Sequence, residues 1–306
     1  MALWICGPLL LAAIFGATAP MASGALPPAT TTWLLTVGCL LAAMASSVSL
    51  GLMALMLIGQ APSLAADGRW SDDVLRSHDQ LTAPVSVAAA ALVVLLAARF
   101  TRVATRRLLA MRATCRLARE LPQTGGELAV IDSAERHAFA LPGRSSRIVV
   151  TSGLLRALNT EQRRAVLAHE RSHLRHRHHL HQSATLLAAS VNPLLCRLPG
   201  AVERSCERWA DEDAARICPR ATVADALTRL ATGLRLPSSS VLLSAAVGDV
   251  AHRVTALLRP PPRLTLWRIA SLSLLLAALI MAVAVAMQNT DRIFDLAQTA
   301  YRAGQR

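Results

Sequence analysis

The chain has 306 residues, of which 53% are hydrophobic and 17% are charged. An ordinary soluble protein is less apolar than this, so part of the chain is expected to lie in a lipid bilayer. The formal net charge of +13 could favour nucleic acid. The arginines, however, crowd beside apolar segments, as they do at the cytoplasmic ends of membrane helices, so no direct binding of nucleic acid is expected.

Four apolar segments are long enough, or nearly so, to cross a bilayer, which takes about 20 residues. They comprise residues 3–19, 33–58, 84–98 and 269–288. The first could instead be a secretory signal peptide, because Ala17-Thr18-Ala19 resembles a cleavage site. No basic residue precedes it, as a signal peptide would require, so a retained membrane helix is the favoured interpretation.

The charges of the loops predict how these helices are oriented. Residues 99–119 carry seven arginines and no acid, whereas residues 60–83 carry four aspartates and two arginines. The positive-inside rule therefore places the segment that begins at residue 99 in the cytoplasm. We divide this multi-pass protein of the cell (inner) membrane into a membrane region of residues 1–98, a cytoplasmic domain of residues 99–268, a fourth membrane helix of residues 269–288 and an extracytoplasmic tail of residues 289–306.

The chemistry of the chain centres on the sequence H-E-x-x-H at residues 169–173. A capping box formed by Asn159 and Gln162 predicts where its helix begins. Histidines four residues apart lie on one face of a helix, so both imidazoles can bind one Zn²⁺ while Glu170 deprotonates the attacking water. The alternative is a solvated, histidine-rich helix face that binds no metal.

A zinc protease of this kind needs a third ligand on a later helix, and Glu207 is a suitable candidate. Asp211 lies one turn further along the same face, where it could accept a hydrogen bond from a ligand histidine. By itself, this pair could equally belong to an exposed acidic face, since arginines alternate with acids nearby.

Four runs of sequence carry a wider match: residues 137–144, 147–155 and 160–170, and Glu207-x-x-Ala-Asp211. Over roughly residues 120–257 the chain resembles the integral-membrane gluzincins. These include heat-shock membrane proteases, CAAX-protease relatives and beta-lactam sensor-transducer proteases. Three helices, a cytoplasmic protease domain and a fourth helix most resemble the sensor-transducer group. Only about 18 residues follow the fourth helix, so no extracellular penicillin-binding sensor domain is expected.

The resemblance implies a mainly α membrane protein with a zincin-like (gluzincin) α+β domain between helices three and four. Residues 127–132 and 147–151 look like short strands of that domain. The resemblance makes the second an edge strand, which could bind a substrate peptide by adding it to the sheet. Arg253 matches a basic position in the last helix of the family and could stabilise an oxyanion, although a position facing lipid headgroups is the simpler interpretation.

The sequence thus predicts a membrane-bound zinc metalloendopeptidase that cleaves a protein or peptide substrate, for example a cytoplasmic transcriptional repressor. A membrane quality-control protease and a catalytically silent receptor remain alternatives. A metal transporter is disfavoured, because the four apolar segments contain no Asp, Glu or His. The candidate residues are Glu170 and Arg253 for catalysis, His169, His173 and Glu207 for Zn²⁺, Asp211 behind the metal, and Arg147, Ile148, Val149 and Val150 for the substrate.

Four further histidines follow the motif, namely His176, His178, His179 and His181. They could form a second metal site. The favoured interpretation is simpler: a basic helix that continues along the anionic inner leaflet of the membrane would have the same composition.

Overall fold

The computed structural model describes residues 3–22, 24, 26–79, 81, 83–120, 126–143, 146–232, 240–260 and 263–305, with the backbone alone for residues 3, 22 and 240–247. Arg144, which ends one of the resembling runs, lies outside the described residues. So do residues 1, 2 and 306 at the outer bounds of the predicted regions.

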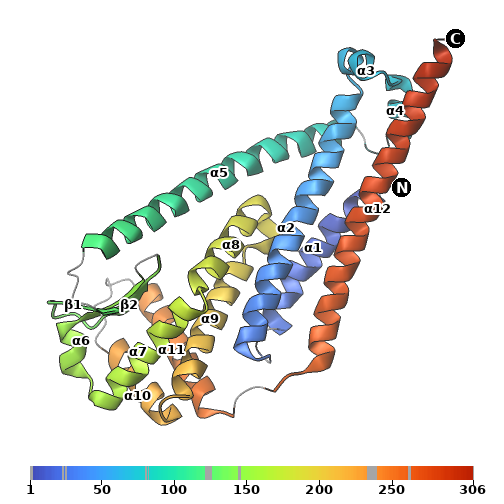
Figure 1. Cartoon of the computed structure of the whole chain (residues 1–306). Helices are drawn as coiled ribbons and strands as arrows, with labels where there is room; N and C mark the ends of the chain where they lie inside the picture. The colour runs from blue at the N-terminus through green and yellow to red at the C-terminus, as the bar shows by residue number, and fades with distance from the viewer. Residues whose placement is uncertain are drawn as a thin grey trace.

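The described part is mostly helical, and Figure 1 shows its arrangement. The helices are α1 (Leu3–Ala22), α2 (Pro28–Gly59), α3 (Pro62–Gly68), α4 (Asp72–His78), α5 (Ala83–Glu120), α6 (Ser152–Ala157), α7 (Thr160–Arg175), α8 (His178–Val191), α9 (Leu198–Ala215), α10 (Arg220–Ala231), α11 (Ser240–Leu258) and α12 (Leu266–Gly304). A 3-10 turn, η2 (Pro193–Leu195), joins α8 to α9. The strands are β1 (Leu128–Ile131), β2 (Ala138–Leu141) and β3 (Arg147–Thr151).

Each of the four predicted apolar segments lies in a helix whose length and composition suffice to cross a membrane: α1, α2, α5 and α12. Two of these helices are much longer than predicted. α5 continues through the arginine-rich stretch to Glu120, because its Ala, Leu and Arg residues favour helix and nothing interrupts them. α12 continues to Gly304 through what looked like a short tail.

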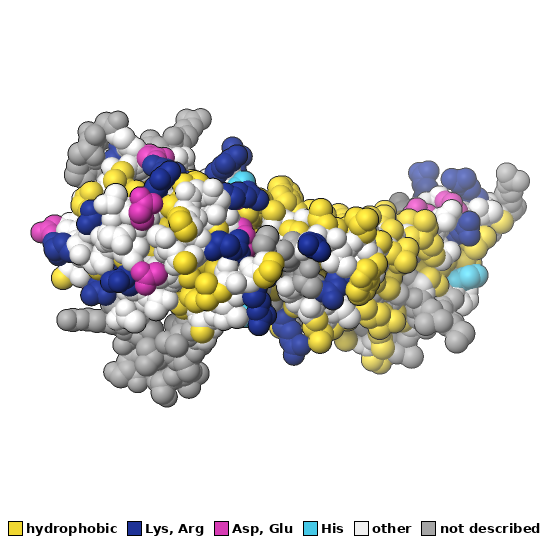
Figure 2. All heavy atoms as spheres, turned by 90° about the horizontal axis from the view of Figure 1, so that it is seen from below, with side chains coloured by type: hydrophobic (Ala, Val, Ile, Leu, Met, Phe, Trp, Pro, Cys, Tyr) yellow, Lys and Arg dark blue, Asp and Glu magenta, His cyan; other side chains and the backbone are white. Residues whose placement is uncertain are grey.

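The surface has the charge distribution of a membrane protein. Figure 2 shows a band of hydrophobic side chains between two ends that carry charged ones. Exposed apolar residues of α2, α5 and α12 contribute to this surface, among them Met44, Leu95 and Leu274. The four helices and this surface support a multi-pass membrane protein.

One hydrophobic core joins the membrane helices to the chain that follows the H-E-x-x-H motif. Its buried members come from α1, α2 and α12, and also from α8, η2 and α9. Asn192, after α8, donates a hydrogen bond from Nδ2 to Ser46 Oγ of α2 at 2.7 Å. Gly16 of α1 lies so close to η2 that a Cβ there would be 2.5 Å from the carbonyl oxygen of Leu194. The predicted membrane region and cytoplasmic domain therefore share a core, and the boundary drawn between them stays a prediction.

The sheet has the order β1-β3-β2, with β1 parallel and β2 antiparallel to β3. β1 and β3 fall within the predicted strands, whereas β2 was not predicted. The prediction that residues 147–151 form an edge strand is wrong. β3 is central, and its Ile148, Val149 and Val150 are buried, as suits a continuous apolar run paired on both sides. In the described sheet β2 forms one edge, and it packs against α7.

Candidate metal centre

α7 begins as the sequence predicts. Asn159 Oδ1 accepts a hydrogen bond from the backbone N–H of Gln162 at 2.9 Å, and Gln162 Oε1 accepts one from the backbone N–H of Asn159 at 2.9 Å. This reciprocal capping box satisfies two N–H groups that the first turn of a helix leaves unpaired. Ala165 and Ala168 bury one side of α7 in a cluster with α9, α10 and α11. Both motif histidines contact Glu207 of α9.

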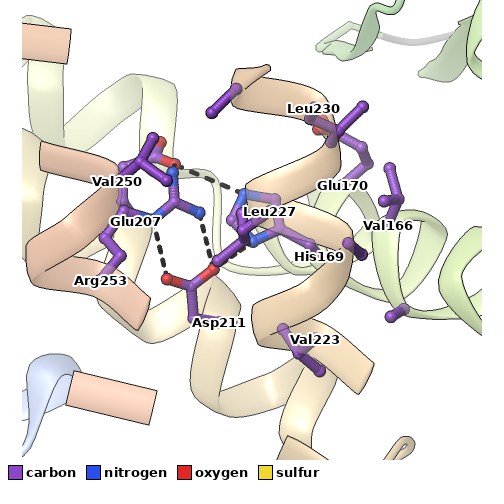
Figure 3. Close-up of a pocket in the computed structure, with 13 residues that line it drawn as sticks. Val166, His169, Glu170, Glu207, Asp211, Val223, Leu227, Leu230, Val250 and Arg253 are labelled. Atoms are coloured by element: carbon purple, nitrogen blue, oxygen red, sulfur yellow. Dashed lines mark hydrogen bonds and ion pairs between the residues drawn. The ribbon is translucent and has the colours of Figure 1, made fainter. Parts of the chain in front are cut away.

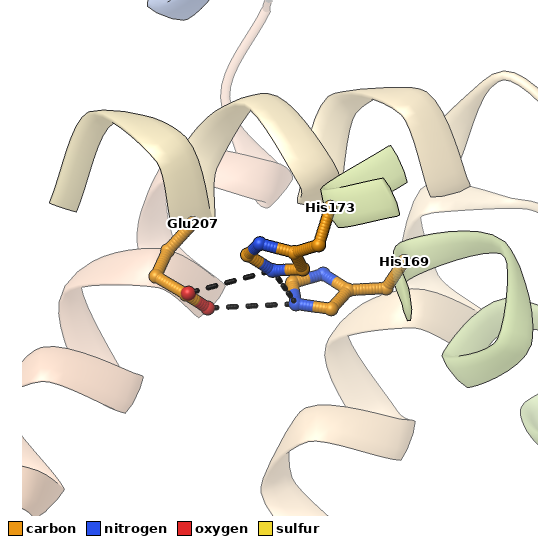
Figure 4. Close-up of side chains that lie close together, drawn as sticks. All are labelled: His169, His173 and Glu207. Carbon is orange, nitrogen blue, oxygen red and sulfur yellow. Dashed lines mark hydrogen bonds and ion pairs between the residues drawn. The ribbon is translucent and has the colours of Figure 1, made fainter. Parts of the chain in front are cut away.

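Three ligand atoms meet between α7 and α9 (Figure 4). The Nε2 atoms of His169 and His173 are 3.1 Å apart. Glu207 places Oε2 at 3.4 Å from Nε2 of His169 and Oε1 at 3.4 Å from Nε2 of His173. A tetrahedral zinc ion with bonds of about 2.0–2.2 Å places its ligand atoms roughly 3.3–3.6 Å apart. Both distances from Glu207 to the histidines lie in this range, and the two Nε2 atoms are slightly closer together than it. A small rotation of one imidazole corrects this, so the set fits Zn²⁺ in chemistry and nearly in spacing.

Asp211 and Arg253 lie directly behind these ligands (Figure 3). Asp211 Oδ1 is 3.0 Å from Nδ1 of His169, close enough for an ion pair but not in line for a hydrogen bond. Arg253 donates from Nε and Nη2 to the two oxygens of Asp211 at 2.8 and 2.6 Å, and its Nη1 is 3.0 Å from Glu207 Oε2. Its side chain is only 12% exposed, so the interpretation that Arg253 faces lipid headgroups is wrong.

Burial and charge set the pKa values of the site. Burial alone would lower the pKa of His169, but contacts with Asp211 and Glu207 raise it to about 9. Burial alone would raise the pKa of Glu207, but His169, Arg253 and His173 lower it to about 2. Burial raises the pKa of Glu170, only partly offset by the charge of His169. Glu207 is thus held ionised, whereas Glu170 binds a proton more readily than an ordinary glutamate.

Two pockets flank Glu170. One, of about 220 Å³, is mostly apolar and is lined by Val223, Leu227 and Leu230 of α10 and Val250 of α11 (Figure 3). The other, of about 370 Å³, lies along β2 and also contacts His173 and Glu207. The structure thus brings six of the predicted residues to one place: Glu170, Arg253, His169, His173, Glu207 and Asp211. Ile148, Val149 and Val150 are buried inside the sheet, and none of them lines either pocket.

The later histidines are not a surface feature. His178 is 1% exposed and His181 6%, so the interpretation of a basic helix lying along headgroups is wrong for both. Among the residues that the structure describes, no second group of metal-binding side chains is found. His178 instead contacts His173, and it packs near Trp209, which lies between Glu207 and Asp211 in the sequence of α9. No sequence pattern pointed to Trp209 or to the apolar pocket, because both depend on contacts between distant segments.

Comparison with known proteins finds a family that part of the chain resembles. Residues 104–198 match the model of peptidase family M48. This segment, about a third of the chain, contains the H-E-x-x-H motif and the sheet but ends before Glu207, Asp211 and Arg253. Neither a curated protein nor a solved structure matches the chain. Over residues 104–198 the chain is thus similar to peptidase family M48, a family of membrane metallopeptidases.

Proposed function

We propose that this protein is a membrane-bound zinc metalloendopeptidase. The observation that carries the proposal is the meeting of His169, His173 and Glu207 at separations close to those of a tetrahedral zinc site. The family supports it, since its members are metallopeptidases. Bound Zn²⁺ would polarise the scissile carbonyl and acidify water.

The residues around the ligands suit peptide hydrolysis. Glu170 lies beside the ligand set, where its carboxylate can take a proton from the attacking water and later give it to the leaving amine. Its raised pKa fits this double role, since an ordinary glutamate holds a proton too weakly. Asp211 orients His169, and Arg253 holds Asp211 and Glu207 in place. With its guanidinium committed to these two carboxylates, Arg253 is better suited to holding the site than to binding an oxyanion.

The groove beside β2 is the proposed path of the substrate. An extended peptide could pair with β2, the strand nearest α7, and so pass Glu170 and the ligand set. The apolar pocket under α10 could take one apolar side chain of that peptide. This assignment transfers to Ala138–Leu141 the role that the sequence gave to Arg147, Ile148, Val149 and Val150.

The cellular role follows from the orientation that the arginines predict. With the site on the cytoplasmic side, the substrate would be a cytoplasmic or membrane-proximal protein, and a transcriptional repressor is one example. Regulatory proteolysis of such a protein is the favoured role, and removal of damaged membrane proteins is the alternative.

Metal analysis together with peptide cleavage tests the activity. Detergent-purified wild type should hold one zinc ion per chain, and Glu207→Ala should lose most of it. Glu203→Ala changes an exposed glutamate of the same helix and serves as the matched control, which should keep its zinc. Glu170→Gln should keep zinc but lose cleavage. A wild type prepared without chelators that held no zinc would disprove the proposal.

A further inference from the structure

The two histidines of the ligand set are supported differently. Behind His169, Nδ1 faces a carboxylate, because Asp211 Oδ1 is 3.0 Å away. Behind His173, Nδ1 faces another imidazole, because Nδ1 of His178 is 3.0 Å away. Ligand histidines are usually held through their second ring nitrogen by a carboxylate, a carbonyl or water. The partner of His173 is therefore unusual for a ligand histidine.

The contact between the two rings fixes where their protons lie. A hydrogen bond between two ring nitrogens needs one donor and one acceptor. If Nε2 of His173 is to bind a metal, its ring proton must sit on Nδ1, and Nδ1 of His178 must then accept it. The proton of His178 consequently sits on Nε2. That atom is buried and has no hydrogen-bond partner among the described residues, so the contact with His173 is the polar contact that holds this ring.

Packing keeps the His178 ring in position. The side chain is 1% exposed, and its ring centroid is 5.1 Å from that of Trp209 and 5.8 Å from that of His176. His176 itself stacks on Trp209 at 4.2 Å and binds Asp213 through Nε2 at 2.8 Å. The ring therefore cannot turn away from His173 without disturbing two packed aromatic neighbours.

We propose that His178 is a positioning residue for the metal centre: it accepts the proton of Nδ1 of His173 and so keeps Nε2 of that ligand deprotonated and aimed at the ion. The inference rests on the proposed zinc-dependent function. A neutral acceptor also suits the charge of the site. Glu207 and Asp211 already place two carboxylates there against the single guanidinium of Arg253.

The test measures zinc affinity by competition with a chelator on the full-length protein in detergent. His178→Leu keeps the apolar bulk but removes the acceptor. His178→Asn keeps an acceptor oxygen near the position of Nδ1. We expect His178→Leu to lose about 10- to 100-fold in zinc affinity and His178→Asn to stay within a few-fold of wild type. His78→Leu, an exposed histidine of α4, controls for the chemical change and should bind zinc as wild type does.

A second readout follows the hydrogen bond itself. In ¹⁵N-histidine NMR spectra of the zinc-loaded protein, the Nδ1 proton of His173 should show the chemical shift of a hydrogen-bonded proton in wild type and lose it in His178→Leu. Wild-type affinity in a folded His178→Leu would overturn the inference and leave the proposed function standing. If the leucine variant does not fold, a loss of tenfold or more in His178→Asn would overturn it instead. A wild type without zinc would disprove the proposed function itself.

Discussion

At the scale of single residues, the centre balances charge within a small buried volume. Asp211 is 2% exposed, and an ionised carboxylate at such a position needs close cationic partners. Arg253 provides two hydrogen bonds to it, and the same guanidinium reaches Glu207. The sequence suggested Arg253 as an oxyanion stabiliser, but its contacts make it a group that holds both carboxylates in place.

These two roles of Arg253 predict different results for Arg253→Leu. Because the substitution leaves Asp211 buried without its main partner, we expect the metal-free protein to lose about 3–5 kcal/mol of stability. Thermal unfolding in detergent measures this loss, and zinc content should fall in parallel. A variant of unchanged stability and zinc content with slowed cleavage alone would instead favour the oxyanion role.

At the scale of elements, the turn between α7 and α8 positions the histidines. α7 ends at Arg175, and Arg177 then adopts a left-handed backbone conformation with φ 52° and ψ 43°. This conformation redirects the chain so that His178, the first residue of α8, returns toward His173. Arginine has a Cβ that disfavours the left-handed region, so the turn is held by the packing of the two helices it joins.

The stability of variants at Arg177 should therefore depend on how well the new residue tolerates the left-handed conformation, and not on the loss of the positive charge. Arg177→Asn should unfold at or slightly above the wild-type temperature, since asparagine tolerates this region. Arg177→Val should lose about 1–2 kcal/mol, because a β-branched side chain is strongly disfavoured there. Thermal unfolding in detergent measures the stabilities of the two variants. Equal stabilities would mean that the left-handed turn is not kept in solution.

The sequence predicted those elements whose signals are local. The capping box at Asn159 and the spacing of His169 and His173 depend on one helix, and both are found as expected. Other features depend on segments far apart in the chain: the pairing of β2, the burial of His178 and the hydrogen bonds from Arg253 to Asp211. Propensity and periodicity contain no information about such contacts, so these features could not be derived.

At the scale of the whole molecule, the two ends of the membrane bundle are distinct. α4 packs against the C-terminal part of α12 at the end opposite the ligand set (Figure 1). The backbone N–H of Ser71 donates to the carbonyl of Ala297 at 3.0 Å, and the rings of Trp70 and Phe294 meet edge to face at 5.5 Å. α4 and the C-terminal part of α12 therefore lie on the same side of any membrane that the bundle spans.

This shared end makes the orientation testable with two cysteines. If the arginine-rich stretch is cytoplasmic, a membrane-impermeant thiol reagent should label Ser77→Cys, an exposed position in α4, on intact cells. Thr160→Cys, an exposed position at the start of α7, should react only after the cells are permeabilised. Each cysteine is tested alone, with the native cysteines replaced by alanine. The reverse pattern would place the metal centre outside the cell, and a cytoplasmic repressor could then not be its substrate.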